Sequence, residues 1–126
     1  MPRLLLEHHL DVLHAELTLL LPEAPSSAYA PLRSAAAQLR TARESAISAQ
    51  RAGELVSAFV SEVEHAGEAD IAPVEAATLL VAAVADERNG LTSAVAGLTG
   101  WLCDSARFSQ SWLHAAERTL SAARRH

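Results

Sequence analysis

Residues 73–90 read PVEAATLLVAAVADERNG, and this stretch decides the fold. From residue 74 to residue 85 only Glu75 and Thr78 are polar, and Ala and Leu, the strongest helix formers, dominate. The proline at its start and the Asn-Gly pair at its end are typical helix boundaries. A helix that is apolar nearly all round is usually buried by neighbours. The stretch therefore predicts the central helix of an all-α domain.

The preceding residues predict one long helix from about residue 28 to residue 66. Its apolar seam alternates spacings of three and four, at Leu32, Ala35, Leu39, Ala42, Ala46, Ala49, Gly53, Val56, Val60 and Val63. A glycine costs about 1 kcal/mol relative to alanine in a helix interior. We therefore expect the long helix to kink, or to break into two, at Gly53.

Shorter helices complete the domain. Pro22 ends a first helix that begins near Pro2. A short helix is expected over residues 91–103, and a last helix from residue 104 or 105 to the end. We predict a single domain over residues 1–126, an antiparallel bundle of four to five helices.

The composition of the chain disfavours several classes of function and partner. The formal net charge of −5 disfavours nucleic acid as a partner. Cys103 is the only cysteine, so no internal disulfide can form. No apolar run is long enough to cross a bilayer, so we expect a cytoplasmic protein without a membrane partner or a cofactor. All ten basic residues are Arg, which together with the abundant Ala is typical of a high-GC, bacterial genome.

The apolar side of the first helix contains two ionisable residues. Its apolar residues form two arcs, Leu6, Leu10, Leu13, Leu17 and Leu20 on one and Leu5, Val12 and Leu19 on the other. His9 and Glu16 lie between the arcs, about 20° apart at 100° per residue. Burying either without a partner costs several kcal/mol. They are candidates for an interior metal or small-molecule site; the alternative is hydrogen bonding to neighbouring helices or to Arg.

The other side of the first helix carries a polar stripe, which consists of Glu7, Asp11, His14 and Thr18. Such a stripe can bind Zn²⁺, but it is far more often a solvated face. Arginines gather in the first half of the long helix, at positions 33, 40, 43 and 51. We therefore expect acidic groups of the first helix, or of a second subunit, beside these arginines.

Two pairs of residues later in the chain have the spacing of known catalytic or metal-binding motifs. Glu62 and His65 have the Glu-x-x-His spacing of di-iron carboxylate bundles, without a second copy. Arg107 and His114 have six residues between them, and this spacing resembles the Arg-x4–6-His motif of HEPN-class helical ribonucleases. Phe108 stands where that class usually has a polar residue. The resemblance implies RNA cleavage, with Arg107 anchoring the phosphate and His114 as general acid or base.

Trp101, Phe108 and Trp112 hold most of the aromatic area. Such residues are more often core, but an exposed one is a candidate interaction residue. The sequence has no phosphate-binding glycine loop and no nucleophile elbow. The two apolar arcs and the long seam exceed what one core needs. We therefore expect a non-catalytic interaction protein, a homodimer or the partner of another protein. The alternatives are a metal- or small-molecule-binding bundle that uses His9 and Glu16, and a HEPN-like ribonuclease that uses Arg107 and His114.

Overall fold

The computed structural model describes residues 3–64 and 71–125. Within these ranges the chain forms six α-helices, one short 3-10 turn and no strand. They are α1 (Arg3–Leu20), η1 (Ser26–Ala28), α2 (Ala30–Ala46), α3 (Ala49–Val63), α4 (Pro73–Arg88), α5 (Ala94–Leu102) and α6 (Gln110–Arg124). The all-α prediction is confirmed, whereas the helix count of four to five was too low. The expected helix start at Pro2 lies outside the described residues.

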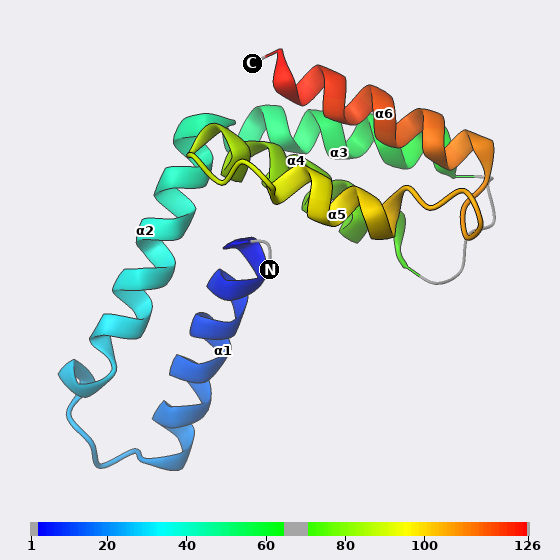
Figure 1. Cartoon of the computed structure of the whole chain (residues 1–126). Helices are drawn as coiled ribbons and strands as arrows, with labels where there is room; N and C mark the ends of the chain where they lie inside the picture. Colours follow the sequence, from blue (N-terminus) through cyan, green and yellow to red (C-terminus); the bar gives the residue numbers. More distant parts are fainter. Residues whose placement is uncertain (1–2, 65–70, 126) are drawn as a thin grey trace.

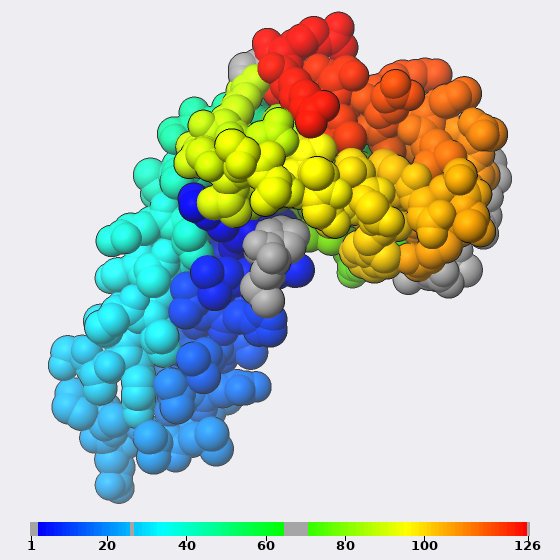
Figure 2. Space-filling view, viewed as in Figure 1, coloured from blue at the N-terminus to red at the C-terminus, as the bar shows by residue number. Residues whose placement is uncertain are grey.

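The helices fall into a bundle and a projecting hairpin (Figure 1). Helices α3 to α6 pack together, and each runs opposite to the one before it. Helices α1 and α2 form an antiparallel pair, which we call the arm (residues 3–46). Figure 2 shows that the far end of the arm stands clear of the bundle. Only the base of the arm, where α1 begins and α2 ends, is therefore covered by other helices.

Helix α4 lies at the centre of the bundle, as its sequence predicts. It contacts α1, α2, α3, α5 and α6. Nine of its residues are buried, and these include every residue from Leu80 to Asp86. Because the second half of α4 is covered by other helices on all sides, an all-round apolar sequence is stable there.

The expected long helix is two helices, and the break is not at Gly53. It lies at Ile47 and Ser48, between α2 and α3. Ile47 is buried in an extended conformation (φ −138°, ψ 116°). The Ser48 hydroxyl caps α3 by accepting a hydrogen bond from the Arg51 N–H at 3.2 Å. Gly53 lies inside α3, so the cost of a mid-helix glycine did not end the helix.

The last helix begins later than predicted. Helix α6 starts at Gln110, and the Ser109 hydroxyl caps it by accepting a hydrogen bond from the Trp112 N–H at 3.3 Å. The Asp104 carboxylate instead accepts a bond from the Ala106 N–H at 2.9 Å. This side-chain bond competes with helix formation, so residues 103–109 form a loop.

Trp112 is the centre of the aromatic core. Its ring stacks on Phe108 at 4.7 Å between centroids and forms a T-shaped pair with Phe59 at 5.1 Å. Its indole Nε1–H donates to the Leu102 carbonyl at 2.9 Å, which satisfies its polar atom. One side chain thus ties α3, the end of α5 and the α5–α6 loop to α6.

Trp112→Ala should lower the free energy of unfolding by about 4 kcal/mol, the usual cost of removing a large buried aromatic. Urea denaturation followed by circular dichroism measures the change. Val74→Ala, at an exposed apolar position of α4, is the control and should cost less than about 0.5 kcal/mol. Equal losses in both variants would contradict the assignment of Trp112 to the core.

Candidate functional site

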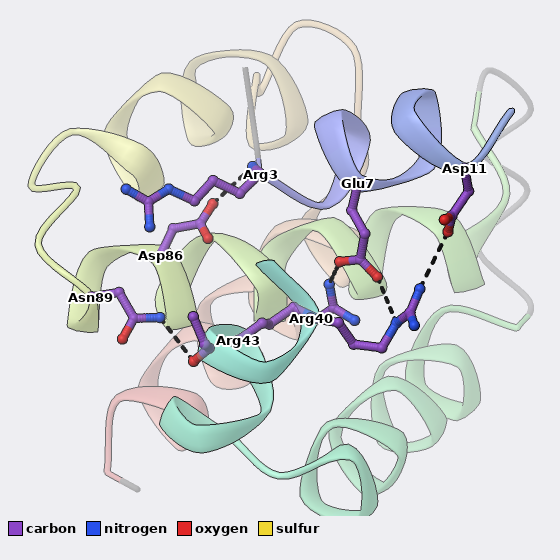
Figure 3. Close-up of polar contacts among 8 residues, drawn as sticks. Arg3, Glu7, Asp11, Arg40, Arg43, Asp86 and Asn89 are labelled. Carbon is purple, nitrogen blue, oxygen red and sulfur yellow. Dashed lines mark hydrogen bonds and ion pairs between the residues drawn. The ribbon is translucent and has the colours of Figure 1, made fainter. Parts of the chain in front are cut away.

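An ion-pair cluster around the buried Glu7 joins the two helices of the arm (Figure 3). Glu7 on α1 is 2% exposed. One of its oxygens accepts from Arg40 Nε at 2.9 Å, and the other pairs with Arg43 Nη1. Arg40 also reaches Asp11 at 3.2 Å. The polar stripe of α1 therefore faces α2, as the clustered arginines of the long helix suggested. Its member Glu7 is buried there, whereas Asp11 and Thr18 remain exposed.

Polar contacts also fix the base of the arm to α4. The buried Asp86 carboxylate accepts a hydrogen bond from the Arg3 backbone N–H at 3.0 Å, at the positive end of the α1 dipole. The Asn89 side chain donates to the Ala42 carbonyl at 3.0 Å. Arg88 donates to the carbonyl of Ala46, near the end of α2, at 2.9 Å. The start of α1 and the end of α2 are thus both held by α4.

The opposite side of α1 is apolar and exposed. We call it the outer face, and it consists of Leu5, Leu6, Val12, Leu13, Leu19 and Leu20 around His9 and Glu16. The exposed fraction of its apolar residues rises from 36% at Leu5 to 81% at Leu19. At 100° per residue, Glu7 points about 160° away from His9. Helix α1 therefore turns its polar stripe toward α2 and presents the outer face to solvent, while Leu10 and Leu17 at the edge between the two sides are partly buried.

His9 and Glu16 are not interior residues. Both are exposed on the outer face, and so the two arcs of leucines between which they lie do not enclose them. In the described part of the chain, no group of three or more His, Cys, Asp or Glu side chains is arranged to hold a metal ion. The structure gives His9 and Glu16 no third ligand from another described helix.

The two residues of the candidate ribonuclease pair lie on different elements. Arg107 lies in the α5–α6 loop, above the rings of Trp101 and Phe108 at 5.8 Å and 5.2 Å. His114 lies on α6 and lines a surface hollow with Glu117, Arg118, Ser121 and Arg125. Both side chains are exposed, and the hollow that His114 lines does not include Arg107. Of the Glu-x-x-His pair, His65 lies outside the described residues, and Glu62 pairs with Arg118 at 3.0 Å.

Trp101 is the exposed member of the aromatic trio. Phe108 and Trp112 are buried in the core, so neither is available to a partner, whereas Trp101 is 45% exposed. Trp101 lies at an apolar groove of about 430 Å³ between α4 and α5. Leu5 of α1 lines the same groove. The groove is therefore continuous with the outer face of α1.

Cys103 is half-buried at the end of α5 and is not activated. Burial raises the pKa of its thiol, and the negative charge of Glu117 raises it further. The thiolate, which is the nucleophilic form, is therefore scarce near neutral pH. Cys103 does not have the properties of a catalytic cysteine.

Glu7→Gln should lower the free energy of unfolding by about 2 kcal/mol, because a neutral amide replaces a buried, charge-assisted acceptor. Urea denaturation measures the loss, and hydrogen exchange should show faster exchange in α1. Glu44→Gln, an exposed carboxylate on α2, is the control and should change stability by less than about 0.5 kcal/mol. A Glu7 variant as stable as this control would rule out the cluster as the support of the arm.

Cys103 should react slowly with a thiol reagent such as DTNB at pH 8 and accelerate as the pH rises further. Glu117→Gln removes one cause of the raised pKa, so the reaction at pH 8 should be faster in that variant. Stopped-flow absorbance checks both rates, with Glu62→Gln as the control. Identical rates in the two variants would show that Glu117 does not act on the thiol.

Comparisons with known proteins give no information on the function of this chain. No family model, curated protein or solved structure matches it. Among the described helices, none combines the length and the apolar character needed to cross a membrane. The strongest functional feature is therefore the outer face of α1 together with the adjoining groove.

Proposed function

We propose that this chain is a non-catalytic interaction protein that self-associates through the outer face of α1. The observation that carries the proposal is the orientation of α1, whose polar stripe meets α2 while its leucines point outward. A contiguous exposed apolar patch on a protein marks an interaction surface. A second copy of the same face would remove these leucines from water.

The exposed surface area of the chain supports the proposal that a partner covers part of it. A compact monomer of this length exposes about 6,500 Å², whereas this chain exposes 7382 Å². The surplus of roughly 900 Å² is close to the area that each partner contributes to a standard protein interface. The surplus over the whole chain is therefore about as large as the area that one dimer interface would cover.

The charges of α1 favour a protein partner over a lipid surface. Membrane-surface helices usually carry Lys and Arg on their polar face. Arg3 is the only basic residue of α1 apart from its histidines, and the polar stripe is acidic and occupied by α2. Glu16 lies within the outer face. A bilayer with anionic lipids would repel such a helix, so we propose that another protein surface covers the outer face.

Leu13→Glu should convert the dimer to a monomer. The substitution would place an unpaired carboxylate of each copy inside the interface, and burying such a charge costs several kcal/mol. We expect the dissociation constant to rise roughly a hundredfold or more. Light scattering coupled to size-exclusion chromatography, at several protein concentrations, measures the mass.

Ala15→Glu is the matched control for this test. Ala15 is exposed on α1 but lies outside the outer face, so its variant should remain a dimer. Circular dichroism of both variants should show unchanged helix content, because neither side chain is part of the core. A wild-type chain that stays monomeric at every concentration would overturn the proposal, and so would a Leu13 variant with unchanged mass.

A further inference from the structure

We infer that two copies pair antiparallel along α1, so that His9 of each copy meets Glu16 of the other. The inference rests on the proposed self-association and specifies its geometry. It comes from the order of residues on the outer face, where His9 and Glu16 are the only polar members. The surplus of exposed area described above sets the size of the contact, and the order of the charges sets its direction.

The outer face is symmetric about its middle. Val12 and Leu13 lie at its centre, two leucines lie near each end, and one ionisable residue lies between the centre and each end. A two-fold axis through the centre therefore brings Leu5 and Leu6 of one copy level with Leu20 and Leu19 of the other. The same axis brings His9 level with Glu16, because both lie about 5 Å from the centre at 1.5 Å per residue.

Charge distinguishes this arrangement from a parallel one. Both arrangements match apolar residues with apolar residues. In a parallel pair, however, the two Glu16 carboxylates would face each other, and like charges in contact are destabilising. In the antiparallel pair each Glu16 meets a histidine that can donate a hydrogen bond to it. The two equivalent His9–Glu16 contacts therefore select the antiparallel orientation.

The groove between α4 and α5 extends the same contact. Leu5 lines both the groove and the outer face. In the antiparallel pair the far end of the other copy's α1 comes to this place, and it carries Leu19, Leu20 and Leu21, each more than half exposed. Trp101 at the groove edge is 45% exposed. Each arm tip thus reaches an apolar groove of the other copy, which assigns Trp101 a place in the interface.

Cysteine cross-linking tests the orientation directly. Leu6→Cys and Leu20→Cys are made separately in a Cys103→Ser chain, and one of them carries a tag that changes its mass. A short bismaleimide is added to each variant alone and to the mixture after equilibration. We expect a cross-linked product between the L6C and L20C chains in the mixture, and little product from either variant alone.

The outcomes separate the inference from the proposed function. Efficient cross-linking of L6C chains with one another would indicate a parallel pair and overturn the inference, while self-association would stand. A dimer by light scattering that gives no cross-link in any mixture would place the contact elsewhere and also overturn it. A monomer at all concentrations would remove the proposed function, and the inference with it.

His9→Arg provides an independent test. Arginine always carries its charge, so each copy would present a full cation to Glu16 of the other. The dissociation constant of the dimer should fall about tenfold, since two equivalent pairs each contribute a few-fold. The control is His8→Arg, which adds the same charge about 100° around the exposed surface of α1 and should change the constant less than about twofold. A weaker dimer in H9R would contradict the His9–Glu16 contact.

Discussion

The arrangement of this chain depends on one buried carboxylate, that of Glu7. A charge in that position must be paired, because an unpaired buried carboxylate costs several kcal/mol. Arg40 and Arg43 supply the pairing from α2. The constraint also sets the rotation of α1 about its own axis. Once Glu7 points at α2, the leucines on the opposite side must point away from it, where the arm offers them no cover.

The sequence predicted the helix boundaries correctly where the backbone preference of a single residue determines the boundary. Pro22 follows α1, and Pro73 and Asn89 bound α4, as their backbone preferences require. Periodicity alone could not locate the break at Ile47 and Ser48, because Ala46 and Ala49 keep the three-residue spacing across it. The missed signal was the capping serine, which outweighs a glycine that the interior of α3 tolerates.

The sequence located the outer face but not its environment. Helical geometry placed His9 and Glu16 between two arcs of leucines, and the structure has them there. Which side of an amphipathic helix meets its neighbour depends, however, on residues far away in the chain. A polar stripe usually faces solvent, and here it faces arginines of α2 about thirty residues later. The clustered arginines were the only sequence signal of that contact.

Polar contacts help to hold the arm, together with the buried Leu4 and the partly buried Leu10 and Leu17, so the leucines of the outer face are not needed to hold it. Asp86 fixes the start of α1, Arg88 and Asn89 fix the end of α2, and Glu7 joins the two helices. The outer face is therefore presented in one orientation before any partner arrives. A surface that is already ordered loses less conformational entropy on association. A larger part of the free energy gained by burying its apolar area therefore contributes to affinity. An arm held through its leucines would have to release them before it could bind, so the inverted polarity of α1 favours association.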